Sequence, residues 1–301
     1  MRVAKAPTVS DGAIVVADNG MHSWRSLNRF HCDSFVRGTA TTMNGGGSVT
    51  KIVSIHSFRG GTGKSNTSAN LAAQVAATGK RVAVIDTDIQ SPGVHVLYGF
   101  HDDTPSPALN DYLWGKCEIS DTAHDVTRSV NGAAVAESSL SLVPSSVKPS
   151  DIARILREGY DVEALNEGFR SLSNDLQLDM LVIDTHPGLN EETLLSITIS
   201  DTLILLMRPD KQDYQGTAVT VDIARRLAVP ELLILVNKVP SGADRATLVA
   251  DIEHIYAAEV AGVLPLSEDV AVNASAGLFS VTQPDHPWSQ EIRKVAARLD
   301  V

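Results

Sequence analysis

One short segment constrains the fold more than any other: a glycine-rich loop between an apolar run and a helix-like stretch. The β-branched run Ile52–Ser57 leads directly into residues 58–65, which read Phe-Arg-Gly-Gly-Thr-Gly-Lys-Ser. Glycines let successive backbone N–H groups turn toward one centre, and the N-terminus of the next helix adds partial positive charge. This order of strand, loop and helix predicts a phosphate cradle.

Two side chains of the loop suit a nucleotide with its metal ion. Lys64 can reach the β- and γ-phosphates, and the hydroxyl of Ser65 can hold Mg²⁺. The usual pattern has glycine where this chain has Phe58, and here the Gly60-Gly61 pair supplies the flexibility instead. The binding residues that the loop predicts are Gly60, Gly61, Thr62, Gly63, Lys64, Ser65 and Asn66.

Beyond the loop, apolar β-branched runs alternate with helical patterns. The runs are Ile52–Ser57, Val82–Ile85, Leu140–Val143, Met180–Ile183, Leu203–Met207, Leu232–Val236 and Val260–Leu264. The helical stretches are Ser65–Thr78, Asp151–Asp175, Gln212–Ala228 and Ala243–Ala257. This alternation predicts an α/β fold with a doubly wound, mainly parallel β-sheet and helices on both faces. Right-handed crossovers then bring the loops that follow the strands to one edge, where ligands bind.

The N-terminal part has a different composition. Residues 1–48 contain few apolar runs and end in a Gly-Gly-Gly-Ser segment, so we expect a flexible extension before a P-loop domain at 49–301. No apolar run approaches the roughly 20 residues of a membrane span, and the N-terminus lacks the apolar core of a signal peptide. We therefore expect a cytoplasmic protein.

Charge and cysteine content exclude some functions. The net charge of −11 argues against a constitutively basic nucleic-acid binder. The two cysteines, Cys32 and Cys117, form no Cys-x-x-Cys pair, which argues against a metal-cluster carrier.

Carboxylates follow two further predicted strands. Asp86 and Asp88 come just after Val82–Ile85, and they lie beside the glycine-rich loop if the two strands are neighbours. A carboxylate that positions water is a plausible hydrolytic device, although strand-end aspartates can also cap the next turn. Met180–Ile183 followed by Asp184 forms a Walker B pattern, whose carboxylate holds Mg²⁺ through water. No role is assigned to His186.

In the order of these motifs, residues 51–299 resemble the ParA/MinD family of deviant-Walker P-loop ATPases, in particular its MinD-like branch. The family loop reads x-Lys-Gly-Gly-x-Gly-Lys-Thr/Ser, and Arg59 stands at its signature lysine. The resemblance implies that two protomers sandwich ATP and that Arg59 acts catalytically across the interface, as an arginine finger would. A solvated charge near the phosphates is the alternative.

The same resemblance implies roles for further residues. Asp88 would orient the attacking water, and Asp86 would support the magnesium shell or Lys64. Asn237, after the strand Leu232–Val236, would hydrogen-bond the purine edge, and Pro265 would flank the adenine.

The implied function is a switch that uses ATP and Mg²⁺. Such a protein forms a homodimer in the ATP state, binds DNA or membrane as a surface, and responds to a stimulating or cargo-adaptor protein. It would be recruited from the cytoplasm to the nucleoid or the inner membrane surface. Two alternatives stay open: an ATP-dependent biosynthetic enzyme on the same scaffold and a non-hydrolysing nucleotide-binding scaffold.

Two features of the sequence bear on whether the protein binds a membrane or DNA. The last helical stretch places Trp288, Ile292, Val295 and Leu299 on one stripe, for which core packing is favoured over an interfacial membrane helix. A basic set could contact DNA, although a solvated helix surface is favoured for it: Lys211, Arg225, Arg226, Lys238 and Arg245.

Overall fold

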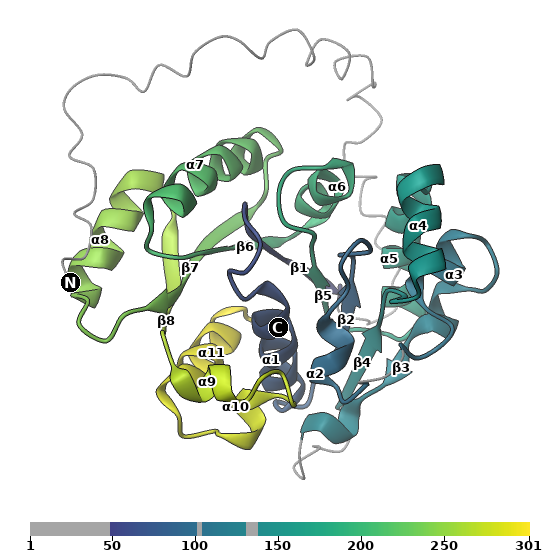
Figure 1. The fold of residues 1–301 in the computed structure, drawn as a ribbon, viewed down its shortest axis with the longest axis horizontal. Coiled ribbons are helices and arrows are strands. Elements are labelled where there is room, and N and C mark those ends of the chain that lie inside the picture. The colour runs from purple at the N-terminus through teal and green to yellow at the C-terminus, as the bar shows by residue number, and fades with distance from the viewer. Residues whose placement is uncertain (1–48, 101–103, 131–137) are drawn as a thin grey trace, which may run out of the picture. The chain divides into compact units, whose positions relative to one another are not determined.

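The computed structural model describes residues 49–301, apart from 101–103 and 131–137. The expected extension at 1–48 lies outside the described residues. The described residues form an eight-stranded sheet in the order β3-β4-β2-β5-β1-β6-β7-β8 (Figure 1). The strands are β1 Lys51–His56, β2 Arg81–Asp86, β3 His124–Asp125, β4 Ser139–Val143, β5 Met180–Asp184, β6 Thr202–Met207, β7 Glu231–Val239 and β8 Glu259–Pro265.

The sheet is parallel except at one edge, where β3 runs antiparallel to β4. All residues of β5 and β6 are buried, as expected for strands covered on both faces. β1 lies between β5 and β6, and β2 lies on the other side of β5. In this register Asp184 is opposite Ile55 on one side and Asp86 on the other, so the carboxyl ends of β1, β2 and β5 meet.

Helices cover both faces of the sheet. Figure 1 shows α1, α10 and α11 on one side and α6, α7 and α8 on the other. The helices are α1 Lys64–Ala76, α2 Val94–Leu97, α3 Leu109–Leu113, α4 Pro149–Glu158, α5 Val162–Asp175, α6 Glu191–Ile199, α7 Lys211–Arg226, α8 Arg245–Tyr256, α9 Glu268–Val272, α10 Phe279–Thr282 and α11 Pro287–Arg298, with 3₁₀ turns at Ile119–Thr122 and Thr127–Val130. The predicted doubly wound α/β fold is confirmed.

One helical prediction differs from the structure. The stretch Asp151–Asp175 forms two helices, because Gly159 adopts a φ of 68° and ends α4. Asp161 then begins α5 by accepting hydrogen bonds from the N–H groups of Glu163 and Ala164.

The apolar stripe of α11 faces the core. Trp288 is 2% exposed, and Ile292, Val295 and Leu299 are fully buried in the cluster that also contains α1 side chains. Core packing is thus confirmed for this stripe over an interfacial role. Within the described ranges, no helix combines the length and apolarity that crossing a membrane requires.

Candidate functional site

The loop between β1 and α1 depends on two glycines with left-handed backbone. Gly61 has a φ of 75° and Gly63 a φ of 100°, values that other residues adopt with strain. A Cβ on Gly63 would also lie 2.6 Å from Nδ2 of Asn237, whereas one on Gly61 would meet nothing within 4 Å. Glycine at 63 therefore lets the loop take this path without backbone strain and without displacing Asn237.

The backbone of this loop presents a row of free donors. Within the described residues, the N–H groups of residues 60–66 donate no hydrogen bond, and no side chain caps α1. The next N–H, of Thr67, bonds to the carbonyl of Gly63 at 3.0 Å. Free N–H groups at the N-terminus of a helix attract anions, because they add to the positive end of the helix dipole.

Hydroxyl groups hold the start of the loop. The Oγ of Ser57 donates to the carbonyl of Arg59 at 2.7 Å, and the Oγ1 of Thr62 donates to the Oγ of Ser57 at 2.9 Å. Ser57 and Thr62 are both buried. Thr62 thus stabilises the loop with its side chain, while its N–H is one of the free N–H groups of residues 60–66.

The end of β7 holds the loop from its other side. The Nδ2 of Asn237 donates to the carbonyl of Thr62 at 2.7 Å, and the Nζ of Lys238 donates to that of Gly61 at 2.8 Å. The Oδ1 of Asn237 accepts the N–H of Lys238 at 2.8 Å, so both ends of this amide are engaged. Pro265 lies nearby in the sheet, paired with Val239. The purine contacts of Asn237 and Pro265 stay predictions.

Lys64 is a nearly buried cation close to three carboxylates. Its side chain is 7% exposed, and within the described residues no hydrogen bond or ion pair holds its Nζ. Burial lowers the pKa of Lys64, while Asp184, Asp88 and Asp86 act in the opposite direction. An ammonium group in this position is placed for a further anion.

Two serines of α1 hold Asp184. The Oγ of Ser65 donates to Oδ2 and the Oγ of Ser68 donates to Oδ1, each at 2.7 Å. Burial raises the pKa of Asp184 to about 6, although both hydroxyls and Lys64 oppose the rise. Ser68 was not predicted. Its spacing of three residues from Ser65 on the same face of a helix is the signal that could have identified it.

The pair of Ser65 and Asp184 fits a magnesium ion. Both groups offer oxygen, and Mg²⁺ in nucleotide sites takes few protein ligands because phosphates and water complete its shell. In the described part of the chain, no group of three or more His, Cys, Asp or Glu side chains could hold a metal by itself. The protein ligands thus fit a metal that arrives with a phosphate ligand.

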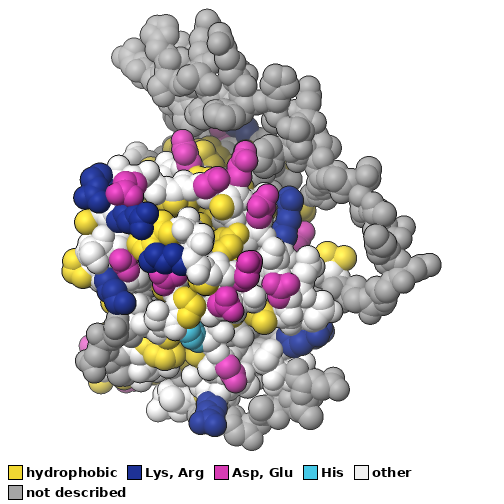
Figure 2. All heavy atoms as spheres, turned by 90° about the vertical axis from the view of Figure 1, so that its right-hand side faces the viewer, with side chains coloured by type: hydrophobic (Ala, Val, Ile, Leu, Met, Phe, Trp, Pro, Cys, Tyr) yellow, Lys and Arg dark blue, Asp and Glu magenta, His cyan; other side chains and the backbone are white. Residues whose placement is uncertain are grey.

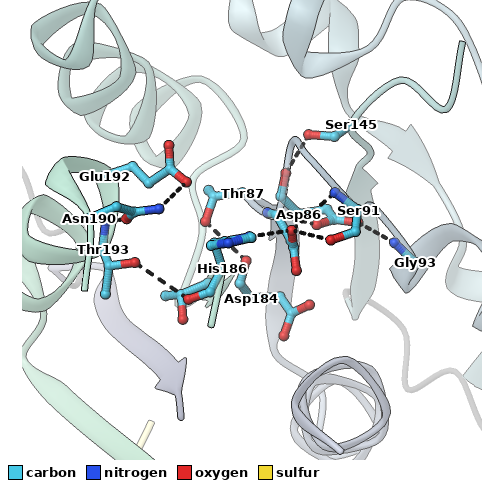
Figure 3. Close-up of polar contacts among 12 residues, drawn as sticks. Asp86, Thr87, Ser91, Gly93, Ser145, Asp184, His186, Asn190, Glu192 and Thr193 are labelled. Atoms are coloured by element: carbon cyan, nitrogen blue, oxygen red, sulfur yellow. Dashed lines mark hydrogen bonds and ion pairs between the residues drawn. The ribbon is translucent and has the colours of Figure 1, made fainter. Parts of the chain in front are cut away.

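Asp86 organises the loop that follows β2. Its Oδ1 accepts the N–H of Asp88 at 3.0 Å, and its Oδ2 accepts those of Gly93 at 3.0 Å and Val94 at 3.3 Å (Figure 3). Burial, Asp184 and Asp88 raise the pKa of Asp86, against the effect of the backbone donors. This carboxyl group therefore fixes the position of Asp88.

Asp88 meets a histidine from the loop after β5. The Nδ1 of His186 lies 2.6 Å from the Oδ1 of Asp88, which also accepts the N–H and the hydroxyl of Ser91 at 3.2 and 3.1 Å. Both side chains are largely buried, at 13% exposure for Asp88 and 21% for His186. The sequence gives no sign of this contact, because the two residues are 98 positions apart.

A second histidine lies beneath the loop. The Nδ1 of His56 is 2.8 Å from the Oγ1 of Thr185, which itself donates to the carbonyl of Ile55 at 3.0 Å. Nδ1 of His56 must therefore carry the proton, and Nε2 has no partner among the described residues. Burial, Lys64 and His186 lower the pKa of His56 to about 3, so this ring is neutral.

Arg59 lies in the loop, and its side chain contacts α7 of the same chain. Its guanidinium donates to the Oε1 of Gln212 and lies 3.9 Å from the Oδ1 of Asp213. The side chain is 40% exposed. The structure thus brings Lys64, Ser65, Asp86, Asp88 and Asp184 to one edge of the sheet, with Arg59 at its margin.

Comparison with known proteins agrees with this geometry. A family model described as an AAA domain matches residues 50–228. The chain is 30% identical to an uncharacterized ATP-binding protein of Methanocaldococcus jannaschii, over 82% of this chain and 86% of that protein. It is also 24% identical to the antiactivator FleN of Pseudomonas aeruginosa, over 83% of this chain and 86% of FleN.

A solved structure has the same fold. The septum site-determining protein MinD of Pyrococcus horikoshii, complexed with Mg-ADP, superimposes with a TM-score of 0.67 over 84% of this chain and 96% of that chain, at 20% identity. The chain belongs to the ParA/MinD family.

Most of the basic residues considered for DNA contact have hydrogen-bond or ion-pair partners within the chain. Arg225 donates to the carbonyls of Tyr256 and Ala257, and Arg226 pairs with Asp222 at 2.8 Å. On another face, which carries α3, α4 and α5, Figure 2 shows basic and acidic side chains interspersed around an exposed apolar area. That face has no single positive field of the kind that binds DNA without sequence preference.

Proposed function

We propose that the protein is a Mg-ATP-dependent ATPase switch that dimerises with ATP. By ATP-controlled binding to a surface, DNA or membrane, and to a partner protein, it would position or partition a cellular cargo. The observation that carries this proposal is the row of N–H groups at residues 60–66 beside the ammonium of Lys64, all of which lack partners in the part of the chain that the structure describes. Such a cradle suits a polyphosphate. Membership of the ParA/MinD family supports the rest of the proposal.

Each residue of the site has a separate role in the proposed phosphoryl transfer. Lys64 neutralises charge on the β- and γ-phosphates while the N–H row binds them, and Asp88 orients the attacking water. Ser65 would hold the magnesium ion, with Asp184 and Asp86 supporting its shell, and the ion would neutralise phosphate charge. Positioning and charge neutralisation are sufficient for this chemistry.

Arg59 completes the site from a second protomer in this proposal. Its guanidinium is bound to α7 by an exposed hydrogen bond and a long ion pair, which are weak contacts that a dimer can replace. Guanidinium groups reach phosphates in trans in related chemistry.

Turnover and binding assays test the proposal together. We expect slow ATP hydrolysis by the wild type, a loss of about 100-fold or more in Asp88→Ala with ATP binding kept, and a loss of ATP affinity of about 30-fold or more in Lys64→Ala. Binding without turnover in the wild type would favour a nucleotide-binding scaffold. Turnover that requires a small-molecule acid would favour a biosynthetic enzyme.

A further inference from the structure

The two oxygens of Asp88 have unequal surroundings. Oδ1 accepts three hydrogen bonds: from the N–H of Ser91, from its hydroxyl, and from Nδ1 of His186. Within the described residues, no group donates to Oδ2. Since a carboxylate only accepts, Nδ1 of His186 carries the proton in this contact. The carboxylate is therefore held by one oxygen and free at the other.

His186 is itself held by its backbone. Its carbonyl accepts the Oγ1 of Thr193 at 3.4 Å, and Thr193 is fixed by the cap of Asn190 at 2.9 Å (Figure 3). Two residues later, the N–H of Gly188 donates to the carbonyl of Ser57 at 3.2 Å. The imidazole thus projects from a loop tied to both α6 and the phosphate loop.

The contact joins two loops that carry different parts of the site. Asp88 follows β2, and His186 follows Asp184 of β5. Ser91 alone would anchor Oδ1 from within its own loop. The bond from His186 at 2.6 Å adds a fixed point outside that loop and sets the direction of the carboxylate.

We propose that His186 is a positioning residue for ATP hydrolysis: its hydrogen bond to Oδ1 of Asp88 directs Oδ2 toward the attacking water. This inference rests on the proposed function, in which Asp88 orients that water. His186 does not touch the nucleotide in this account, and its effect passes through Asp88.

Matched substitutions separate positioning from a purely structural role. In His186→Asn the side-chain amide nitrogen replaces Nδ1 as donor to Asp88, whereas His186→Ala removes the donor. We expect kcat to fall about tenfold to a hundredfold in His186→Ala, with the Kd for ATP within about twofold of the wild type. His186→Asn should retain kcat within about threefold. In an Asp88→Ala background, His186→Ala should lower kcat no further, because the two residues act as a unit.

Each departure from this pattern overturns the inference. An unchanged kcat in His186→Ala, an equal fall in His186→Asn, or an additive effect with Asp88→Ala would show that His186 does not act by donating to Asp88. A fall in ATP affinity equal to the fall in kcat would show a structural role in binding.

A spectroscopic readout does not depend on turnover. In ¹⁵N-histidine-labelled protein, the ring signal that disappears in His186→Asn should show the Nδ1–H tautomer, and it should shift in Asp88→Ala. An Nε2–H tautomer, or a signal unaffected by Asp88→Ala, would overturn the inference. A wild type that shows the Nδ1–H signal but hydrolyses no ATP would instead overturn the proposed function.

Discussion

Gly63→Ala should disrupt the phosphate loop for two separable reasons. The φ of 100° at Gly63 costs an alanine about 1–3 kcal/mol of strain. Its Cβ would also lie 2.6 Å from Nδ2 of Asn237 and displace an amide that donates to the carbonyl of Thr62 at 2.7 Å. Loss of that buried hydrogen bond costs about 1–3 kcal/mol. The reduced entropy of the unfolded chain offsets about 0.4–1 kcal/mol.

Gly61→Ala is the matched control. Its φ of 75° imposes comparable strain, but the added Cβ meets nothing within 4 Å. We expect the free energy of unfolding to fall by about 2–4 kcal/mol in Gly63→Ala and by about 1 kcal/mol in Gly61→Ala. Both glycines belong to the row of free N–H groups, but only the Cβ at position 63 would push against Asn237 and shift that row, so Gly63→Ala should also lose more ATP affinity.

Urea unfolding and calorimetric titration with ATP measure the two effects. In an Asn237→Ala background the clash is absent, so Gly63→Ala should cost no more than Gly61→Ala does. Equal losses for the two glycine variants in the wild-type background would refute the assignment of a steric role to Asn237. So would a cost of Gly63→Ala that is unchanged when Asn237 is removed.

Three further predictions follow from particular contacts. The pKa of His56 is about 3 in the folded protein against 6.5 in the unfolded chain, so the unfolded chain binds the proton first as pH falls from 6.5 toward 3. Asp184 and Asp86 titrate in the opposite sense, so the comparison is between variants: from pH 7.5 to pH 5 the free energy of unfolding should change less favourably, by about 2 kcal/mol, in the wild type than in His56→Asn. The same change in both proteins would contradict the assignment. In Gly216→Ala the new Cβ would lie 2.2 Å from the ring of Phe58, so the free energy of unfolding, measured with heat or urea, should fall by about 1–3 kcal/mol. The fall should be smaller in a Phe58→Ala background, and equal falls in the two backgrounds would exclude this contact as the cause. Arg59→Ala should change the stability of the free protomer by less than about 1 kcal/mol, since the Arg59 side chain is 40% exposed, its hydrogen bond to Gln212 is exposed and its ion pair with Asp213 is long at 3.9 Å. The same variant should abolish ATP-dependent association in light scattering, and association that survives would remove Arg59 from the interface.

The sequence predicted most of the framework because the buried strands leave an unambiguous pattern. β5 and β6 are apolar throughout, and their ends could be placed within a residue or two. The break at Gly159 was missed because helical patterns continue on both sides of it, and a single glycine within such a pattern is often tolerated. The short antiparallel strand β3 has two residues and no pattern to detect.

The candidate site was predicted in part for the same physical reason. Lys64, Ser65 and Asp184 follow strands that the topology makes neighbours, so their convergence could be inferred. The partner of Asp88 could not, because His186 reaches it through the conformation of two loops. Nor could the engagement of Asn237 with Thr62, since an amide suits a purine and a carbonyl equally well.

In the proposed function, ATP controls the association of two protomers across this site. Light scattering on Asp88→Ala, which should bind ATP without turning it over, tests it most directly. With Mg-ATP we predict a mass near twice the 32.1 kDa of the chain, and with ADP the mass of one chain, while Lys64→Ala should stay monomeric in both. The same mass for Asp88→Ala with either nucleotide would contradict the account.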